Sequence, residues 1–498
     1  MKILDLLETY KVSERLAMIS ETETLTYREL WEKSESLAAY INDKCGTDKT
    51  PVIVYGHKSP WMMVCFIACV KSGRAYVPVD ISVPKSRVEA IIDSVEPRII
   101  LASEEFGAYR DYFCYDVRHN TYHGGTKVSP EGYVREEDIF YIIFTSGSTG
   151  VPKGVQITYG ALNHFTEWAL SLGQIEKQHK KIINQAPFSF DLSVMDLYMS
   201  LASESCLCVL EKEAQQEYKR LFERLAVTNA DVWVSTPSFA DVCLADPSFN
   251  QKLIPNLRLF LFCGETLTNK TAGALLQRFP KAEVYNTYGP TESTVAVTEV
   301  KVDSKLNGQF QPLPVGRVKP GTQIHIMDGE KIVPEGEKGE IVISGNTVSA
   351  GYFKNQKEND RAFYVTDQGG NLLRSYRTGD KGYFKDGMLF YCGRIDLQIK
   401  LHGYRMELED VEENLMKVPG VKKAAVVPVS DNGKVKYLKA CCIYENNIED
   451  KRREMKKVKA EMAKFVPDYM VPRKIIFVES IPMTNNGKVD RKKLQEIQ

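Results

Sequence analysis

The chain has 498 residues, which is too long for one ordinary hydrophobic core and predicts two or more domains. Hydrophobic residues make up 43% of it and charged residues 26%, so a disordered, collagenous or membrane-embedded chain is excluded. The 65 basic residues balance 65 acidic ones, which leaves no overall charge to indicate a nucleic-acid or anionic-lipid partner.

The N-terminus and the cysteines indicate a cytoplasmic protein. Residues 1–11 mix charges throughout and lack the apolar core of a secretory signal, and the longest apolar run, residues 61–70, is too short to span a membrane. The cysteines stand singly except for Cys441 and Cys442, and none has zinc-ligand spacing. We therefore expect reduced thiols and no membrane insertion.

Short apolar runs alternate with longer stretches of helical period over the first three hundred residues. The runs 51–55, 98–101 and 140–144 are bounded by polar or turn residues, as buried parallel strands are, and residues 61–72 and 85–95 have the helical period. This alternation predicts an α/β domain with crossover connections.

The pattern of predicted secondary structure changes in the last two hundred residues. Glycine-punctuated short strands predict a β-rich subdomain at about 316–391. From Leu397 to Gln498 there are 21 Lys and Arg against 15 Asp and Glu, and both helical and strand patterns recur. We predict an α/β fold with a large N-terminal domain at 1–395, which includes the β-rich subdomain, and a small mobile α+β domain at 396–498.

The most informative segment is residues 145–154, Thr-Ser-Gly-Ser-Thr-Gly-Val-Pro-Lys-Gly, which follows an apolar predicted strand. Its glycines let backbone N–H groups approach an anion, its hydroxyl groups donate further hydrogen bonds, and Lys153 adds positive charge. It is not a Walker A loop, because Lys153 is followed by Gly rather than Ser or Thr. The segment predicts a phosphate-binding loop of another kind; the alternative is a flexible surface turn.

Four further segments complete an ordered set of motifs. They are Asn-Thr-Tyr-Gly-Pro-Thr-Glu at 286–292, Tyr-Arg-Thr-Gly-Asp at 376–380, Gly-Arg-Ile-Asp at 393–396 and Asn-Gly-Lys-Val-Asp-Arg at 486–491. The set resembles the motifs of the adenylate-forming superfamily, which includes acyl-CoA synthetases, luciferases and the adenylation domains of nonribosomal peptide synthetases. The resemblance spans nearly the whole chain and implies an AMP-forming ligase that uses ATP and Mg²⁺.

The resemblance also implies roles for single residues. Tyr288 is expected to stack on adenine, Asp380 to bind the ribose hydroxyls, and Glu292 to hold Mg²⁺, a cation that prefers carboxylate, phosphate and water oxygens. Arg394 and Lys488 are expected to neutralise the anions that the reaction brings together, so the expected catalytic residues are Lys488, Arg394 and Glu292. The whole set implied to bind ATP or AMP is Thr145, Ser146, Gly147, Ser148, Thr149, Lys153, Asn286, Thr287, Tyr288, Asp380, Arg394 and Lys488. The alternatives are a capped turn at 288–292 and a solvated lysine at 488.

Asp191 resembles the aspartate with which amino-acid-activating members hold the substrate ammonium; the alternative is an N-cap of the following helix, and both roles can coexist. The pocket positions that the resemblance implies are Asp191, Leu192, Met195, Leu261, Cys263, Thr287, Val295 and Ala296. Asp191 carries their only charge and Met195 is bulky, so a short apolar substrate is expected. Cys263 is interpreted as a wall that selects chirality, or as a buried structural cysteine.

Longer strings resemble a stand-alone branch of the superfamily that activates D-alanine and loads it onto a carrier protein for teichoic acid D-alanylation. These strings are residues 185–196, 235–239, 262–265 and 398–409. The chain ends eight residues after Asp490, so the phosphopantetheine-bearing carrier is expected to be a separate protein. The branch also implies that the C-terminal domain rotates about Asp396 between the two half-reactions, withdrawing Lys488 and presenting Gly403 to the pantetheine arm.

Three alternatives stay open from the sequence. The substrate could be another small amino acid, such as L-alanine, glycine or serine. The enzyme could be a fatty-acyl or aryl CoA ligase, which shares the nucleotide motifs but has no need of Asp191. The chain could also be an inactive scaffold, although Lys153, Glu292, Asp380 and the other expected catalytic residues are all present.

Overall fold

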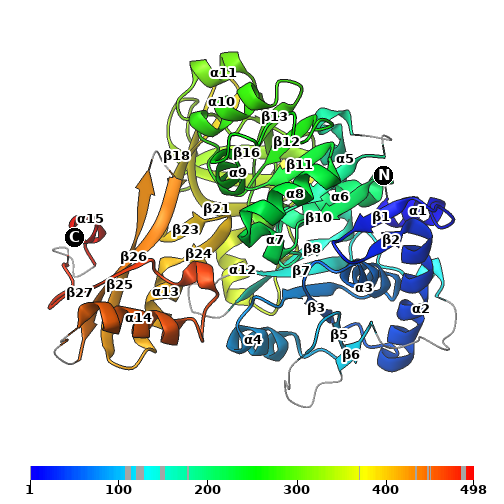
Figure 1. Ribbon diagram of the computed structural model, residues 1–498, viewed down its shortest axis with the longest axis horizontal. Helices are drawn as coiled ribbons and strands as arrows, with labels where there is room; N and C mark the ends of the chain where they lie inside the picture. The colour runs from blue at the N-terminus through cyan, green and yellow to red at the C-terminus, as the bar shows by residue number, and fades with distance from the viewer. Residues whose placement is uncertain are drawn as a thin grey trace. The chain divides into compact units, whose positions relative to one another are not determined.

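The computed structural model of the chain describes residues 2–106, 114–118, 128–145, 152–175, 179–368, 371–431, 434–445, 448, 450–483 and 489–497. These residues form two compact units (Figure 1). The larger unit comprises Met1–Ile81, Val95–Ile143 and Gly154–Gly393, and the smaller unit comprises Ser82–Ser94, Phe144–Lys153 and Arg394–Gln498. Among the described helices, none is long and apolar enough to cross a membrane.

One sheet of the larger unit contains seven strands in the order β19-β8-β7-β4-β3-β5-β6. The strands from β7 to β6 pair in parallel, as the apolar runs of the sequence predict. The bounds are β3 Val52–Gly56, β4 Tyr76–Asp80, β5 Ile100–Ala102, β6 Cys114–Asp116, β7 Ile139–Thr145, β8 Lys153–Thr158 and β19 Gly351–Tyr352. Every residue of β3 and β4 is buried, because neither face of a parallel sheet is left to solvent.

A second, nine-stranded sheet has the order β15-β14-β13-β12-β11-β9-β10-β1-β2, and its inner strands from β13 to β1 are also parallel. The bounds are β1 Leu16–Ile19, β2 Thr24–Thr26, β9 Lys181–Asn184, β10 Cys206–Val209, β11 Val232–Ser235, β12 Leu259–Phe262, β13 Glu283–Tyr288, β14 Thr298–Val302 and β15 Arg317–Val318. In open α/β sheets ligands bind beyond the carboxyl ends of parallel strands, and several expected site residues follow β9, β12 and β13.

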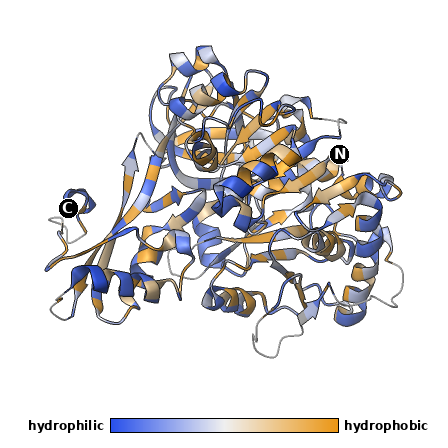
Figure 2. Cartoon of the chain, viewed as in Figure 1, coloured by the Kyte–Doolittle hydropathy of each residue, from blue (hydrophilic) through white to orange (hydrophobic). Residues whose placement is uncertain are grey.

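Helices connect these strands, and their starts are encoded locally. Thr26 and Glu29 form a reciprocal capping box at the start of α2, and Ser59 caps α3, which has Pro60 as its first residue. The bounds are α1 Ile3–Thr9, α2 Tyr27–Cys45, α3 Pro60–Lys71, α4 Lys85–Val95, α5 Tyr159–Ser171, α6 Leu192–Ala202, α7 Lys212–Gln216, α8 Tyr218–Thr228, α9 Pro237–Leu244, α10 Asn269–Arg278, α11 Ser304–Gln309 and α12 Gln356–Ala362. In Figure 2 the strands and α3 are largely hydrophobic, which agrees with their burial.

The expected β-rich segment forms an antiparallel sheet of six strands, β17-β16-β18-β21-β20 with β22 paired to β21. The bounds are β16 Thr322–Asp328, β17 Lys331–Ile332, β18 Gly339–Gly345, β20 Phe363–Gln368, β21 Asn371–Lys385 and β22 Met388–Arg394. Asp386 and Gly387 join β21 to β22 with φ of 54° and 68°. Two consecutive positive φ values are those of a type I′ turn, and Asp-Gly is a preferred sequence for it.

The smaller unit contains an α+β core around the C-terminal strands. The hairpin β23–β24 turns at His402 and Gly403, whose φ values are 52° and 85°, and β25, β26 and β27 form a three-stranded sheet. Helices α13 and α14 bury Val411, Leu415 and Val458 in a separate apolar cluster. The bounds are β23 Gln398–Leu401, β24 Tyr404–Glu407, α13 Leu408–Met416, β25 Val421–Asp431, β26 Lys434–Tyr444, α14 Lys451–Met462, β27 Lys474–Phe477 and α15 Arg491–Glu496.

Lys71, at the end of α3, is fully buried in the larger unit. Its Nζ lies 3.3 Å from the centroid of the Trp31 ring and donates to Ser34 Oγ at 3.0 Å. Burial lowers the pKa of Lys71 to about 7, against the weaker opposing effect of Glu35 and Glu8. An unfolded lysine keeps its proton up to a pH of about 10.4.

The buried Lys71 therefore makes stability depend on pH. Between about pH 7 and pH 10 the unfolded chain holds a proton at this position that the folded chain has released, so this group increases the free energy of unfolding as pH rises. We expect the melting temperature of the wild type, relative to that of Lys71→Met, to increase from pH 7 to pH 10. A difference between the two proteins that did not change with pH would contradict this assignment.

Candidate active site

Tyr288 and Asp380, expected at the adenine and the ribose, are in direct contact. Tyr288 ends β13, and its hydroxyl donates a hydrogen bond of 2.6 Å to Oδ2 of Asp380 on β21. Both side chains are buried, with 6% and 1% exposed. A buried carboxylate that already accepts one hydroxyl hydrogen bond has the chemistry to accept others from a sugar.

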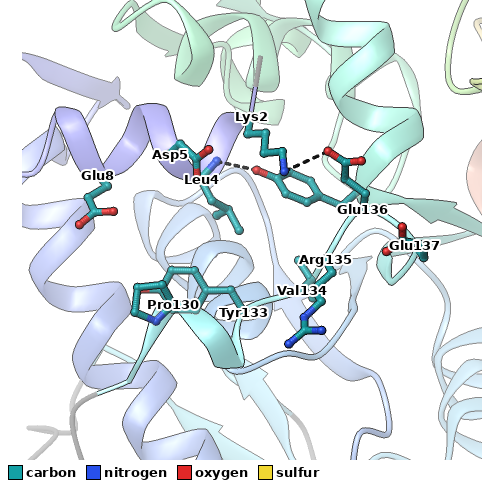
Figure 3. A pocket seen from close by; sticks show the side chains of 11 residues that line it. Lys2, Leu4, Asp5, Glu8, Pro130, Tyr133, Val134, Arg135, Glu136 and Glu137 are labelled. Atoms are coloured by element: carbon teal, nitrogen blue, oxygen red, sulfur yellow. Dashed lines mark hydrogen bonds and ion pairs between the residues drawn. The ribbon is translucent and has the colours of Figure 1, made fainter.

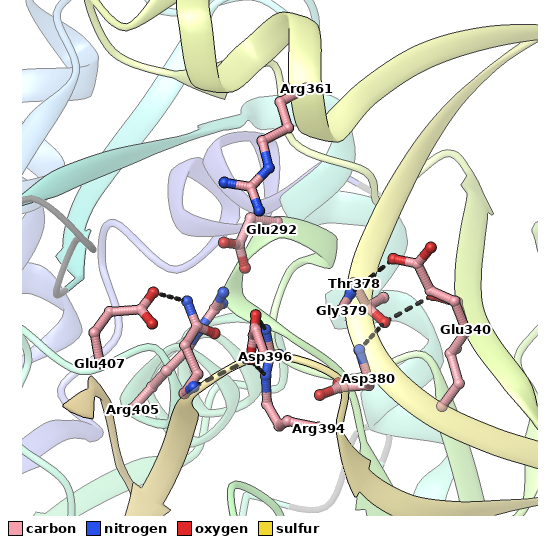
Figure 4. A network of polar contacts seen from close by, with 12 residues as sticks. Glu292, Glu340, Arg361, Thr378, Gly379, Asp380, Arg394, Asp396, Arg405 and Glu407 are labelled. Carbon is pink, nitrogen blue, oxygen red and sulfur yellow. Dashed lines mark hydrogen bonds and ion pairs between the residues drawn. The ribbon is translucent and has the colours of Figure 1, made fainter. Parts of the chain in front are cut away.

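The irregular part of β21 that carries Asp380 is held by its own hydrogen bonds (Figure 4). Thr378 Oγ1 donates to the carbonyl of Ile341 at 2.7 Å, and the Asp380 N–H donates back to Thr378 Oγ1 at 2.9 Å. The Gly379 N–H donates to Glu340 Oε1 at 3.1 Å. These bonds tie this part of β21 to β18, so Asp380 is fixed in direction before any ligand binds.

Asn286 and Thr287 are buried next to Tyr288, but their side chains bond to the protein backbone. Asn286 Nδ2 donates to the carbonyl of Pro314 at 2.8 Å, and Thr287 Oγ1 donates to the carbonyl of Phe262 at 2.9 Å. These bonds link β13 to its surroundings and to β12. In this structure the two side chains support the end of the strand, while their backbone remains beside Tyr288.

Glu292, expected to hold Mg²⁺, is buried with 1% of its surface exposed. The hydroxyl of Tyr352 donates to Glu292 Oε1 at 2.7 Å, and the Ser349 N–H donates to the Glu292 carbonyl at 2.8 Å. Tyr352 OH also lies 3.5 Å from Tyr376 OH. Sequence reasoning missed Tyr352, because a single tyrosine sixty residues from its partner leaves no local signal.

A magnesium ion is compatible with this carboxylate. Within the described ranges, no group of three or more His, Cys, Asp or Glu could hold a metal by protein ligands alone. Mg²⁺ commonly takes one or two carboxylates and completes its shell with phosphate and water oxygens. Glu292 could therefore hold the ion together with a nucleotide, and the ion would neutralise phosphate charge.

The segment after Glu292 turns sharply. Thr294 and Val295 have φ of 58° and 65°, and a positive φ is unfavourable for a β-branched residue such as valine. Thr294 Oγ1 donates to the Thr347 carbonyl at 2.8 Å, and Cys263 Sγ donates to the Val295 carbonyl at 3.5 Å. A Cβ added at Gly289 would lie 2.5 Å from the Cα of Ala296. The turn thus packs Val295 and Ala296 tightly against Cys263 and Gly289.

Asp191 precedes α6 at the N-cap position, but its side chain makes no capping hydrogen bond. Its Oδ2 instead accepts a hydrogen bond of 2.6 Å from Thr291 Oγ1. The capping alternative for this side chain is therefore wrong. The contact brings Asp191 next to the residue that precedes Glu292.

The apolar pocket residues share one buried cluster. Leu192 and Met195 on α6, Leu261 on β12, and Cys263, Val295 and Ala296 each have at most 3% of their surface exposed. The residues expected to line the amino-acid pocket thus come from three separate stretches of chain and lie together in the core of the larger unit.

Of the predicted phosphate-binding loop, the structure describes only the two ends, and it does not describe Lys488. Thr145 ends β7 and Lys153 begins β8, and Thr145 Oγ1 donates to the Lys153 carbonyl at 3.4 Å. Ser146, Gly147, Ser148, Thr149 and Lys488 lie outside the described residues. Their roles remain predictions.

In the smaller unit, Arg394 is paired with the expected hinge residue Asp396. Arg394 Nε donates to Asp396 Oδ1 at 2.7 Å, its second nitrogen bonds Oδ2, and the Gln398 N–H also donates to Oδ1 (Figure 4). Partial burial acts to raise the pKa of Asp396, but the hydrogen bond and charge of Arg394 outweigh it, so this pKa is lowered. Burial raises the pKa of Glu407, whose carboxylate accepts a hydrogen bond from Gln398.

A separate surface cavity of about 330 Å³ lies between α1, residues 130–137 and Tyr159. Figure 3 shows Lys2 paired with Glu136 there. The Leu4 N–H donates to the Tyr159 hydroxyl at 2.8 Å. Its lining carries charges of both signs, and none of the expected site residues contributes to it. The contacts around Asp380, Glu292 and Asp191 therefore define the candidate active site.

Comparison with known proteins gives concordant results along the chain. The model of the AMP-binding enzyme family matches residues 8–353, and that of the AMP-binding enzyme C-terminal domain matches residues 410–488. The chain is 45% identical to the D-alanine–D-alanyl carrier protein ligase of Bacillus licheniformis over 100% of this chain and 99% of the relative. It is 46% identical to the ligase of the same name from Listeria welshimeri over 95% and 94% of the two chains.

Solved structures agree on the fold. An NRPS protein containing adenylation and PCP domains matches with a TM-score of 0.83 and 25% identity over 99% of this chain and 97% of that chain. The Vibrio cholerae adenylation domain AlmE, solved in complex with glycyl-adenosine-5'-phosphate, matches with a TM-score of 0.82 and 23% identity over 99% and 96%. By these matches the chain belongs to the AMP-binding enzyme family and, within it, to the family of the D-alanine–D-alanyl carrier protein ligases.

Proposed function

We propose that this protein activates D-alanine with ATP, forming D-alanyl-AMP and pyrophosphate, and then transfers the D-alanyl group as a thioester to the phosphopantetheine arm of a separate carrier protein. This is the first step of teichoic acid D-alanylation. The observation that carries the proposal is the hydrogen bond between Thr291 and Asp191, which joins the expected ammonium-binding carboxylate to the segment of Glu292. The relatives that bear this name, 44–47% identical to the chain, support it.

In the first half-reaction the amino-acid carboxylate attacks the α-phosphate of ATP and pyrophosphate leaves. Asp191 would pair with the substrate ammonium, since an unpaired ammonium is costly in a buried pocket. Asp380 would accept the ribose hydroxyls, and Tyr288 would lie against the adenine. Glu292 would hold Mg²⁺ through the phosphates, while Lys153, Arg394 and Lys488 would neutralise the anions that must meet.

The walls of the pocket support a small substrate. Met195 and Leu261 are completely buried, and Val295 and Ala296 are held by the turn after Glu292. The bond from Cys263 Sγ to the Val295 carbonyl gives the thiol a defined direction. A rigid wall of this kind can discriminate between the two sides of an α-carbon, and the relatives named D-alanine–D-alanyl carrier protein ligases are the basis for proposing D-alanine over L-alanine.

In the second half-reaction the carrier thiol attacks the mixed anhydride and AMP leaves. One lysine cannot serve in both steps at the same place, so we infer that the C-terminal domain turns about Asp396, withdraws Lys488 and brings Gly403 toward the pantetheine arm. Gly403 lies at the turn of the β23–β24 hairpin, which suits a narrow approach. We also propose the cytoplasm as the location of this protein, because the scheme consumes ATP.

Pyrophosphate exchange tests the substrate assignment. The purified protein should exchange labelled pyrophosphate into ATP with D-alanine and much more weakly with L-alanine, glycine or D-serine. A preference for L-alanine or glycine would overturn D-alanine but keep amino-acid activation. Exchange with acetate or a fatty acid, and with no amino acid, would instead favour an acyl-CoA ligase and remove the role of Asp191.

Tyr352→Phe is expected to weaken Mg²⁺ use. The change removes only the hydroxyl that donates to Glu292 Oε1, and a hydrogen bond to a charged group contributes about 1.5–3 kcal/mol. The Mg²⁺ concentration for half-maximal exchange should rise about tenfold. Tyr376→Phe is the matched control, because its hydroxyl lies beside that of Tyr352. Equal effects of the two changes would contradict a specific role for Tyr352.

A further inference from the structure

Lys58 is a buried lysine that links the seven-stranded and nine-stranded sheets of the larger unit. It follows β3 in the seven-stranded sheet with φ of 46°, and only 2% of its surface is exposed. Its Nζ donates to the carbonyl of Gln185 at 2.5 Å and to that of Leu210 at 2.8 Å. These carbonyls directly follow β9 and β10 of the nine-stranded sheet.

The same place is braced by a second set of hydrogen bonds. Gln215 Nε2 donates to the same two carbonyls, at 3.2 Å to Gln185 and 2.7 Å to Leu210. The side chain of Gln185 in turn donates to Gln215 Oε1 at 3.0 Å. The backbone at the start of residues 185–191 is therefore held from two directions.

Asn184 ties the start of this segment to Asp196, which lies five residues beyond its end. Asn184 Nδ2 donates to the Ala186 carbonyl at 3.1 Å and to Asp196 Oδ1 at 3.0 Å. Asn184 and Asp196 are both completely buried. Asp196 directly follows Met195, so the stretch that carries Asp191, Leu192 and Met195 is anchored at both ends by this cluster.

Burial and the neighbouring charges act in opposite directions on the pKa values of Lys58 and Asp196. Burial lowers the pKa of Lys58 to about 8, while the charges of Asp196, Asp80 and Glu211 act to raise it. Burial raises the pKa of Asp196, and the hydrogen bond from Asn184 and the charge of Lys58 act against this. Asp80, one of the charges that act on Lys58, has its Oδ2 2.7 Å from His57 Nδ1. A methionine could fill the volume of Lys58 without any of this desolvation, so stability alone does not explain the ammonium.

We propose that Lys58, together with Asn184 and Asp196, is a positioning group for amino-acid recognition: it holds residues 184–196 so that Asp191 meets the substrate ammonium and Met195 bounds the substrate side chain. The proposal rests on the proposed function for the role of Asp191. Lys58 itself touches no substrate in this scheme, and acts through the backbone of Gln185 and Leu210.

Lys58→Met tests the proposal, with Lys71→Met as its matched control. Both changes replace a buried ammonium by an apolar chain of similar length, but Lys71 contacts Trp31 and Ser34 on α2, outside residues 184–196. In Lys58→Met we expect the KM for the amino acid to rise at least tenfold, since the buried carbonyls of Gln185 and Leu210 lose the charged one of their two side-chain donors, while the KM for ATP changes less than about twofold. Lys71→Met should leave both values unchanged.

Asn184→Leu supplies a second variant, which cuts the tie between Ala186 and Asp196 and leaves Lys58 in place. It should raise the amino-acid KM in the same direction. A rise in both KM values for Lys58→Met, or an amino-acid KM within twofold of wild type, would overturn the proposal.

Hydrogen exchange separates this proposal from the proposed function. In Lys58→Met, without any substrate, the backbone amides of residues 188–195 should exchange at least tenfold faster than in the wild type, and those of Lys71→Met should not. If the wild type activated no amino acid but exchange in this segment still became faster in Lys58→Met, the proposed function would be wrong. The role of Lys58 in holding the segment would still stand. Unchanged exchange at residues 188–195 would make the positioning role wrong, whatever the substrate.

Discussion

Replacing Asp191 by asparagine should reduce amino-acid-dependent pyrophosphate exchange by about 10²–10³-fold, because removing one partner of a buried charge pair costs about 2–5 kcal/mol. Asparagine keeps the shape of the side chain and an oxygen that can accept the hydrogen bond from Thr291. Only the negative charge opposite the substrate ammonium is lost. The effect should fall on kcat/KM for the amino acid, measured at saturating ATP.

Thr291→Val is the control for this prediction. It removes the hydrogen bond to Asp191 Oδ2 but keeps the charge, so kcat/KM should fall about tenfold or less. ATP affinity, followed by fluorescence of a nucleotide analogue, should be the same in both variants. If Asp191→Asn kept wild-type activity with D-alanine, the carboxylate would not be the ammonium partner.

Lys488→Ala should separate the two half-reactions. Removal of a cation that stabilises charge at the transferring phosphoryl group typically costs about 10³-fold or more, so exchange should fall by that amount. Thioester formation from supplied D-alanyl-AMP and carrier protein should stay within about threefold of the wild type, because the lysine is expected to be withdrawn in that step.

Lys492→Ala is the matched control for Lys488. Lys492 is an exposed lysine of the same C-terminal stretch, and its loss should change neither half-reaction. Equal losses of both half-reactions in Lys488→Ala would make the division of labour between two domain positions wrong.

Much of the fold follows from local sequence signals. Apolar runs at 51–55, 98–101 and 140–144 correspond to β3, β5 and β7, and the stretches 61–72 and 85–95 to α3 and α4. These patterns are readable because burial of one strand or one helix face depends on spacing within a few residues. The order of strands in the sheets is not local, and the pairing of β1 with β10 joins residues almost two hundred positions apart.

The same distinction applies to the candidate site. Motifs supplied Tyr288, Glu292, Asp380 and Asp191, because each lies in a short segment whose residue types and order are recognisable. Their supports were invisible in the sequence. Tyr352 reaches Glu292 from another strand, and Lys58 reaches Gln185 from the other sheet, so neither has a neighbour in sequence that reveals its role. The hydrogen-bond partner of Asp191 could not be predicted from sequence either. In the structure its side chain bonds to Thr291 and not to the start of α6.

The tight packing of Gly289 against Ala296 limits how this pocket can be redesigned for other substrates. Since the two backbones are in contact, substitution at Gly289 would displace the chain rather than add a side chain to the wall. Val295 already has an unfavourable backbone conformation, so a change there alters the turn as well as the volume. Space for a larger amino acid is therefore better made by shortening the Met195 side chain than by a change at Gly289 or Val295, and a change at Cys263 would also remove its bond to the Val295 carbonyl.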